Sequence, residues 1–339
     1  MRVALDAMGG DGAPDVNIEG AILAALEMEK GDMIYLVGPE SLIKEKLAAN
    51  KLYAKLTNIH VVNATEVIGM CEPPVEAIRR KKDSSISVMA KLAANGEVDA
   101  IVSAGNTGAC VAASQLRVRN LPGVNRPGIA TVFPTQSGPH TICDVGANVS
   151  CKPINIYQYA VMASVYARQM LGIDNPRVGL LSIGEEDSKG NDITKKTREL
   201  LKADPRLNFI GNIEGRDIFK GVCDVTVCEG FVGNIVLKLT EGLVDHLFKA
   251  IKDEIKKENI FLALKFKGMM KKFYKKYDYH EYGGALLLGI NGTSVICHGS
   301  SEPRSIKNAV LAAKKFTNKH INDKIVEWLL NSSVETPNE

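Results

Sequence analysis

The sequence predicts an α/β fold of three layers, with a mostly parallel, doubly wound sheet between helices. One observation is that short apolar runs recur along the chain. Another is that polar segments with helical spacing separate most of them, as between Ile18 and Leu26. Expected strands cover 2–7, 33–38, 59–64, 100–104, 128–134, 141–145, 177–183, 208–213 and 225–229.

Five glycine-rich turns each follow a short apolar run, and in open α/β sheets ligands bind at such strand ends. We therefore expect the turns to form the rim of one active site. An additional expected strand at 286–288 precedes the last of them. The turns cover 8–12, 105–108, 184–191, 229–234 and 289–293.

Residues 128–145 depart from the alternating pattern. Two strand runs follow each other there, separated by a turn from Pro134 to Pro139 that contains Ser137 and Gly138. A connection this short favours an antiparallel pair. We expect an arm that serves dimerisation.

A protruding helical hairpin is expected over 240–280, because helical patterns at 235–258 and 260–277 meet at a break. In the second helix, lysines surround an apolar face and no acidic residue occurs between 259 and 277. Such a helix can lie on an anionic membrane, or it can pack on its own protein or a second copy. The face expected to touch a membrane contains Phe266, Met269, Met270 and Phe273.

The remaining chain is expected to form one catalytic unit over 1–330, with a structural helical region at 303–330 and a tail at 331–339. The 339 residues are 45% hydrophobic and 24% charged, which is typical of soluble globular proteins. A net charge of +3 does not favour nucleic-acid binding. No signal peptide or membrane span is recognised, so we expect a cytoplasmic protein with at most peripheral membrane contact.

Seven cysteines without a CxxC pair indicate reduced thiols, mostly in the core. Cys297 and His298 are adjacent and suggest a nucleophile with its base. Neighbours on a strand point to opposite faces, however, which disfavours that pair.

The segment from Ser103 to Gly108 passes from a strand into a helix through small polar residues. Backbone N–H groups at such a helix start can hold phosphate. Alternatively, Asn106 or Thr107 is an ordinary N-cap. Both interpretations remain open from the sequence.

Nucleotide and metal sites are not predicted. Residues 9–12 do not match G-x-G-x-x-G, and Lys189 precedes Gly190 instead of following it as in a P-loop. The carboxylates of 185–187 resemble a Mg²⁺ site but lack an identifiable partner ligand. We expect no cofactor and no metal.

Three side chains in or near these turns suit catalysis, each with a structural alternative. Lys189 can meet an anion or an oxyanion, or can be a solvated turn residue. Asn234 can donate hydrogen bonds to a carbonyl or phosphate oxygen, or can cap a helix. His298 can transfer a proton or bind an anion, or can be structural.

Taken together, the motifs resemble the phosphate acyltransferase family, PlsX, of bacterial phospholipid synthesis. The resemblance runs from the first residue to about 330, and the motifs show no departure from the family's pattern. They lie at 5–11, 103–109, 144–148, 181–186, 189–190, 229–234 and 299–301.

The resemblance implies transfer of a long-chain acyl group from acyl carrier protein to inorganic phosphate, giving acyl phosphate for phosphatidic acid synthesis. It implies a homodimer, a fold similar to isocitrate and isopropylmalate dehydrogenases and phosphate acetyltransferases, and delivery of product to a membrane acyltransferase that acylates glycerol 3-phosphate. Peripheral association with the inner face of the cell membrane follows. The basic groups at 79–82 and at Arg117, Arg119 and Arg126 then suit an acidic carrier protein.

On this reading, amides around 105–108 and Lys189 hold phosphate, Asn234 stabilises the tetrahedral oxyanion, and His298 is a lesser candidate for phosphate contact. Asp6 and Asp11 orient the lysine or the turn. Two rivals remain: an enzyme like phosphate acetyltransferases that uses acyl-CoA, and a noncatalytic membrane-surface scaffold for carrier protein. The expected phosphate and substrate residues are Asp6, Gly10, Asp11, Ser103, Gly105, Asn106, Thr107, Gly108 and Gly233.

Overall fold

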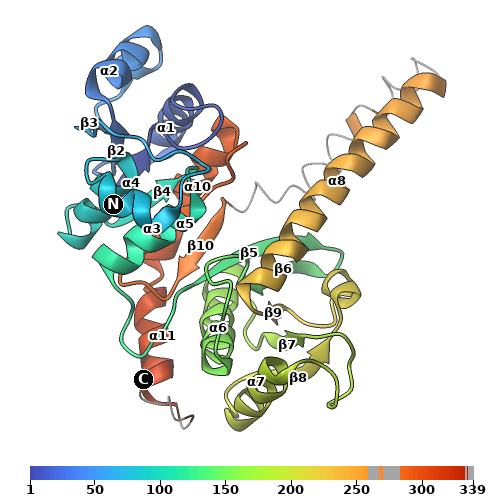
Figure 1. Cartoon of the computed structure of the whole chain (residues 1–339). Helices are drawn as coiled ribbons and strands as arrows, with labels where there is room; N and C mark the ends of the chain where they lie inside the picture. The colour runs from blue at the N-terminus through green and yellow to red at the C-terminus, as the bar shows by residue number, and fades with distance from the viewer. Residues whose placement is uncertain (259–265, 267, 270–282, 333, 335–339) are drawn as a thin grey trace.

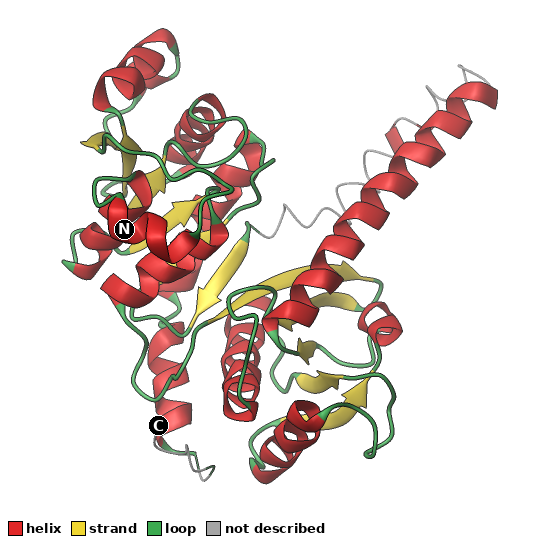
Figure 2. Cartoon of the chain, viewed as in Figure 1, coloured by secondary structure: helices red, strands yellow, loops and turns green. Residues whose placement is uncertain are grey.

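Eleven strands form one sheet in the computed structural model, which describes residues 1–258, 266, 268–269, 283–332 and 334 (Figures 1 and 2). Their order across the sheet is β3-β2-β1-β4-β11-β10-β5-β6-β9-β7-β8. The strands are β1 (Arg2–Asp6), β2 (Met33–Gly38), β3 (Ile59–Asn63), β4 (Ala100–Ser103), β5 (Gly128–Thr135), β6 (Gly138–Cys143), β7 (Arg177–Leu181), β8 (Asn208–Ile213), β9 (Val225–Val227), β10 (Ala285–Leu288) and β11 (Thr293–Ile296).

Helices cover both faces of the sheet, which confirms the predicted three layers. One face carries α1 (Asp15–Glu27), α6 (Pro153–Tyr166), α7 (Asp192–Ala203), α10 (Pro303–Asn318) and α11 (Ile321–Leu330). The other carries α3 (Pro74–Arg80), α4 (Ser85–Ala94), α5 (Thr107–Ala113) and the start of α8 (Gly230–Glu258). The other helical segments are α2 (Glu40–Ala49), η1 (Tyr53–Lys55), η2 (Ser114–Val118), η3 (Ala167–Leu171) and η4 (Gly215–Lys220).

Two hydrophobic clusters, one on each face, hold these layers together. In β1, Val3 and Leu5 belong to one cluster and Ala4 to the other, because successive side chains on a strand point to opposite faces. After Pro153, every residue of α6 is buried, as expected of a helix that is apolar nearly all round. The core therefore runs along both faces of the sheet.

The parallel strands form two sets that run in opposite directions. Strand β5 is antiparallel to both of its neighbours: Ala130 pairs with Cys143 of β6 on one side and with Leu286 of β10 on the other. Strand β10 is also antiparallel to β11. Strands β1, β2, β3, β4 and β11 form one parallel set, and β6, β7, β8 and β9 form the other. The carboxyl ends of the two sets consequently lie on opposite sides of the sheet, measured along the strand direction.

The antiparallel pair predicted over 128–145 is confirmed. Strand β6 begins at Gly138, three residues earlier than expected, because pairing continues to Thr135 beside the turn. Only residues 128–130 also pair with β10, and only 141–143 with β9. The rest of the hairpin is a two-stranded ribbon that extends past its neighbours.

Helix α8 begins at Gly230 and not at 235, so the expected turn at 230–234 is wrong: these residues form the helix's first turn. Neither Gly230 nor Gly233 has a positive φ. A methyl group on Gly233 would overlap the Asp144 carbonyl oxygen, and one on Gly230 would lie 2.5 Å from the Asn148 carbonyl oxygen. These glycines permit close packing of the helix on the 144–148 loop.

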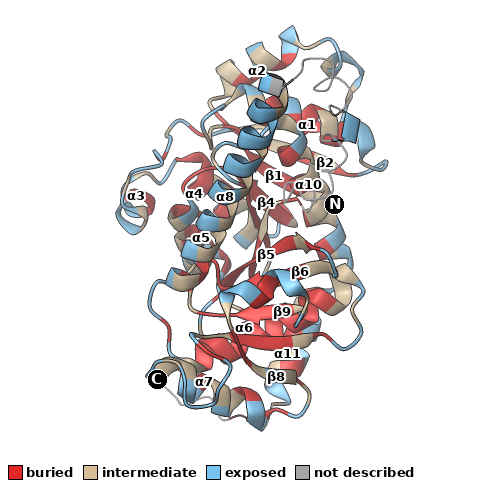
Figure 3. Cartoon of the chain, turned by 90° about the vertical axis from the view of Figure 1, so that its right-hand side faces the viewer, coloured by how far each residue is buried: buried red, intermediate tan, exposed pale blue. Residues whose placement is uncertain are grey.

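The far part of α8 projects from the body of the protein (Figure 1), and most of its length is exposed (Figure 3). In the predicted second helix, Phe266 and Met269 are helical, whereas Met270 and Phe273 lie outside the described residues. The region expected at 303–330 is two helices, since His320 between them has a φ of 51°.

Asp204, at the end of α7, joins that helix to α6 and α11. Its carboxylate accepts hydrogen bonds from Arg206, from the Tyr157 hydroxyl at 2.8 Å and from Trp328 Nε1 at 3.1 Å. Burial alone would raise the Asp204 pKa, but these donors outweigh it and lower the pKa to about 2. Folding thus favours the ionised carboxylate.

Because the folded pKa lies below that of an unfolded aspartate, this stabilisation is present above about pH 4 and is lost as the pH falls toward 2. Asp204→Asn should therefore lower the thermal midpoint at pH 7, by roughly 5 °C for a loss of about 2 kcal/mol. The difference in thermal midpoint between Asp204→Asn and wild type should become smaller between pH 4 and pH 2. Exposed Asp174→Asn is the control, and a difference in thermal midpoint between Asp204→Asn and wild type that is the same at all pH values would contradict the assignment.

Candidate active site

The carboxyl ends of β1, β4 and β11 bring together the first group of predicted site residues. Ser103 donates to Asp6 Oδ2 at 2.7 Å and accepts from the Gly105 amide at 3.0 Å. The Met8 amide donates to the other Asp6 oxygen. Asp6 is fully buried, and burial raises its pKa despite these donors. Asp6 therefore fixes the two glycine-rich turns against each other.

Gly10 and Asp11 join this group through the loop after β11. Gly10 has a φ of +96°, and a methyl group there would lie 2.9 Å from the Gly299 carbonyl oxygen. The Asp11 amide donates to that same oxygen at 2.8 Å, while Asp11 itself is exposed. The sequence prediction that Asp11 orients a turn applies to its backbone; its carboxylate faces solvent beside Gly299.

Asn106 proves to be a helix cap. Its Oδ1 accepts from the Ala109 amide at 3.0 Å, and its amide donates to the carbonyl oxygens of Gly69, Met70 and Glu72. Since the Gly105 amide binds Ser103, the backbone N–H groups left at the open start of α5 belong to Thr107 and Gly108. These two amides are the ones suited to an anion.

His298 lies at the end of β11, on the same edge as Asp6 and Ser103. Its Nδ1 is 2.7 Å from Ser300 Oγ and accepts from the Ser300 amide, which leaves the ring proton on Nε2. Nε2 lies 3.9 Å from Glu241 Oε2 of α8. The imidazole is partly exposed.

The second group lies at the carboxyl ends of β6 and β9, where Asp144 organises the loop to Asn148. Asp144 is buried and accepts from the backbone amides of Ile129, Gly146, Ala147 and Asn148. Burial raises its pKa, although those amides oppose the shift. The loop that it shapes lies beneath the first turn of α8.

Asn234 projects from that turn. Its amide nitrogen donates to the Val145 carbonyl oxygen at 3.0 Å, and a methyl group on Gly146 would lie 2.7 Å from the same nitrogen. An amide nitrogen carries two hydrogens, so one fixes the side chain and the other remains for a ligand. Asn234 is exposed, as a substrate contact requires.

Lys189 lies beyond β7, on the same edge as the second group, and is exposed. Its amide donates to the Glu186 carbonyl oxygen, and its Cγ lies close to Gly184. Among the described residues we find no ion pair of its ammonium; the nearby Asp187 pairs with Lys202 and Arg198. Lys189 is thus available to an anionic ligand.

Helix α8 connects the two groups, which the reversed strand directions would otherwise separate. Asn234 stands at its base and Glu241 is seven residues further on, two turns along the same face. Glu241 is 12% exposed, pairs with Lys238 at 2.8 Å and reaches His298. Glu241 and Asp144 were missed as site residues; the seven-residue spacing from Asn234 was the available signal for Glu241.

The fifth predicted turn does not belong to this site. Residues 289–292 connect β10 to β11, and their backbone bonds to Arg119 and Leu121. Asn322 of α11 donates to the carbonyl oxygens of Ile290 and Gly292. The turn is bonded to the 119–121 segment and to α11, with Asn291 exposed, and among the described residues has no hydrogen bond to either group of site residues. The expectation that all five turns form one rim therefore does not hold for this turn.

A cysteine nucleophile is also disfavoured. Cys297 is buried, and burial raises the pKa of its thiol to about 12, so a thiolate does not form near neutral pH. Six of the seven cysteines are buried and Cys71 is exposed. In the described residues, no three His, Cys, Asp or Glu side chains are grouped as metal ligands would be.

Almost the whole chain is similar to known proteins. Residues 1–324 match the model of a family described as "Fatty acid synthesis protein". The chain is 50% identical to a phosphate acyltransferase of Geotalea uraniireducens, covering 97% of this chain and 94% of the relative. It is 48% identical to a phosphate acyltransferase of Geobacter sulfurreducens, covering 96% and 94%.

Among solved structures, a phosphotransacetylase from Streptococcus pyogenes has a similar fold. The TM-score is 0.62 over 93% of this chain and 94% of that one, with 17% sequence identity. At this identity the likeness concerns the fold alone. It agrees with the fold class predicted from the sequence.

Proposed function

The chain belongs to the fatty acid synthesis protein family and is an acyltransferase, and we propose that it transfers a long-chain acyl group from acyl carrier protein to inorganic phosphate. The observation that carries this proposal is identity near 50% over almost the whole chain to proteins named phosphate acyltransferase. Acyl phosphate made in this way would supply phosphatidic acid synthesis. The exposed basic residues Arg79, Arg80 and Lys82 agree with an acidic carrier protein.

In the proposed reaction, a phosphate oxygen attacks the thioester carbonyl carbon. A tetrahedral oxyanion forms, the carbon–sulfur bond breaks, and the departing thiolate takes up a proton from solvent or from the phosphate. The protein must hold phosphate against the thioester and stabilise the oxyanion. No covalent intermediate with the protein is needed.

We assign phosphate binding to Lys189, which lies on the same side of the sheet as Asn234; the amides of Thr107 and Gly108, with His298, form a second candidate phosphate site at the opposite strand ends. Asn234 donates its second amide hydrogen to the oxyanion. Asp6, Ser103, Gly105 and Gly10 support the turns, and Gly233 lets Asn234 approach. Because the two groups lie on different strand sets, the substrates must span the space along α8 from Asn234 to Glu241.

The donor is tested by incubating the protein with palmitoyl carrier protein or palmitoyl-CoA, with and without phosphate, and trapping acyl phosphate with hydroxylamine. We expect phosphate-dependent hydroxamate, formed preferentially from the carrier-protein thioester. Hydroxamate from palmitoyl-CoA alone would favour the acyl-CoA rival. If neither donor gives phosphate-dependent hydroxamate, only the noncatalytic scaffold for carrier protein remains as a function.

For a homodimer, the supporting observation is a stripe of exposed apolar residues along α8. Ile235, Leu239 and Leu243 recur every four residues and are 51%, 68% and 53% exposed. A helix face of this kind needs a partner in water. Leu239→Asp with Leu243→Asp should yield a monomer by light scattering; an unchanged mass would exclude this face.

For the membrane contact, no helix in the described part of the chain is long and apolar enough to span a bilayer. Phe266 is partly exposed and Met269 is 54% exposed, beyond the projecting α8. Together with the surrounding lysines, they support peripheral attachment, from which product would pass to a membrane acyltransferase that acylates glycerol 3-phosphate.

Replacing Phe266 and Met269 with glutamate should abolish co-sedimentation with anionic liposomes, because charge would replace the inserted apolar side chains. Turnover with soluble substrates should remain within about twofold, since these residues lie outside the candidate site. Retained co-sedimentation would favour the alternative in which this segment packs on protein.

A further inference from the structure

An apolar groove of about 390 Å³ lies between α8 and the tip of the β5–β6 ribbon. Phe133 and Pro134 come from β5, Phe219 comes from η4, and Val244, Phe248 and Ile251 come from α8. Phe133 and Phe219 stack with their ring centroids 5.8 Å apart. Phe219 and Ile251 are 43% and 47% exposed, so this surface is apolar yet open.

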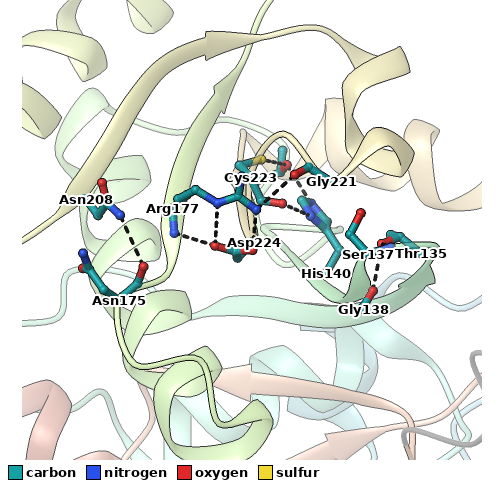
Figure 4. A network of polar contacts seen from close by, with 11 residues as sticks. Thr135, Ser137, Gly138, His140, Asn175, Arg177, Asn208, Gly221, Cys223 and Asp224 are labelled. Atoms are coloured by element: carbon teal, nitrogen blue, oxygen red, sulfur yellow. Dashed lines mark hydrogen bonds and ion pairs between the residues drawn. The ribbon is translucent and has the colours of Figure 1, made fainter.

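Two residues after Phe219, Gly221 belongs to a polar network that joins this segment to β6 and β7 (Figure 4). Arg177 donates twice to Asp224, at 3.0 and 2.9 Å, and once to the Gly221 carbonyl oxygen. His140 of β6 bonds to the Cys223 carbonyl oxygen and to Thr226, and burial lowers its pKa to about 4, so it is neutral. Bidentate arginine–carboxylate pairs are strong and geometrically specific. The network therefore fixes the chain that follows Phe219.

One end of the groove meets the candidate site. Glu241 lines the groove and also faces His298 Nε2 at 3.9 Å. The groove lies at the edge of the sheet where β11 ends, because the β5 tip points the same way as that strand. Apolar surface is thus continuous with the proposed phosphate and thioester chemistry.

We propose that this groove binds the acyl chain of the substrate, which enters at the Glu241 end with the thioester carbonyl beyond that end, toward Asn234; this inference rests on the proposed function. A concave, mainly apolar pocket with a few polar groups is typical of a small-molecule site, and its volume falls in the range of such sites. From Glu241 to Ile251 the helix rises about 15 Å, about the length of an extended zigzag of twelve carbon–carbon bonds.

The groove face of α8 is turned from the face proposed for a second copy but meets it further along the helix, because Leu247 and Ile251 continue the four-residue spacing of the stripe and also line the groove. At 100° per residue, Val244 points about 140° around the helix from Leu239. Val244 and Phe248 turn toward the β5–β6 ribbon of the same chain. A chain in the groove and a partner confined to Ile235, Leu239 and Leu243 therefore contact different side chains.

Filling the groove at two depths tests the proposal. Val244→Trp, near the thioester end, should lower kcat/KM for palmitoyl and dodecanoyl carrier protein at least about tenfold, since each buried methylene contributes about fourfold. Butyryl carrier protein should be affected less than about twofold. Ile251→Trp lies about 10 Å further along the helix, so only the palmitoyl donor should suffer.

Lys249→Trp places the same side chain on the exposed opposite side of these turns and should leave chain-length preference unchanged. Binding of the fluorescent fatty acid cis-parinaric acid gives a readout without turnover: Val244→Trp should weaken it about tenfold and Lys249→Trp should not. Thermal midpoints near wild type show that the variants fold.

Equal losses for all chain lengths, or undiminished palmitoyl transfer in Val244→Trp, would overturn the groove assignment. The assignment would also be overturned if Val244→Trp and Ile251→Trp excluded acyl chains of the same length. If wild type makes no acyl phosphate from any donor, the proposed function fails instead. Parinaric acid binding that is sensitive to Val244→Trp would then still identify an acyl site.

Discussion

Asn234→Ala is expected to lower kcat by about 10²–10³-fold, the usual cost of removing one oxyanion donor. The amide is held by its hydrogen bond to the Val145 carbonyl oxygen, so its second hydrogen is already oriented. Such a donor needs no reorganisation when negative charge develops on the carbonyl oxygen. The measurement is steady-state turnover with palmitoyl carrier protein and phosphate.

Folding should be little affected, because the native structure loses one amide–carbonyl hydrogen bond of about 1 kcal/mol. Asn331→Ala is the matched control, since Asn331 also donates its amide to a backbone carbonyl, that of Glu327, far from the site. It should leave kcat unchanged. If Asn234→Ala retains turnover within about twofold, the oxyanion role is refuted.

Lys189 is distinguished from Asn234 by the kinetic constant that changes. Lys189→Ala removes a charge assigned to phosphate binding, so KM for phosphate should rise more than kcat falls, and Lys189→Arg should restore part of the loss. A change in kcat alone would instead place Lys189 at the oxyanion. If Lys189→Ala has the wild-type kcat and KM for phosphate, Lys189 is a solvated turn residue without a role in the reaction.

Gly233→Ala is expected to have the largest effect on folding. Its methyl group would overlap the backbone carbonyl of Asp144 and lie 3.0 Å from Cys228 Sγ, so the helix must move. Overpacking of this kind costs about 1–3 kcal/mol, which corresponds to a fall of roughly 5 °C in thermal midpoint. Turnover should fall as well, because Asn234 is the next residue.

Gly242→Ala provides the control within the same helix. No atom of the described residues lies within 4 Å of its added methyl group, so the substitution should stabilise α8 by about 0.5–1 kcal/mol. The two changes are chemically identical and should have opposite signs. A Gly233→Ala variant as stable as Gly242→Ala would refute close packing at the base of α8.

These two glycines also show where sequence interpretation reached its limit. Strands β2 and β8 have the bounds that the sequence predicts; in β2 an apolar run that contains Ile and Val specifies the strand locally. From the sequence alone, the glycines at 230 and 233 indicate a turn. Their role is to avoid a collision with residues 144–148, and such a collision depends on contacts between segments far apart in the sequence.

The sequence predicts that Asp6 and Ser103 lie at strand ends, and the structure places them there; their roles in catalysis stay predictions. How the candidate residues group was not predictable, because the direction of each strand set depends on the insertion of β10 beside β5, from opposite parts of the chain. Glu241 lies mid-helix without a local motif. Only the folded chain places it against His298.

Helix α8 behaves mechanically as a rod. With 29 residues it is about 43 Å long, and it is seated at its base on the Asp144 and Asn148 carbonyls. A tilt of about 5° at the base would swing the far end by almost 4 Å, given that length. Conversely, a surface that clamps the far end restricts the base to a fraction of an ångström. Attachment of the far end of α8 would therefore reduce the positional fluctuation of the Asn234 amide.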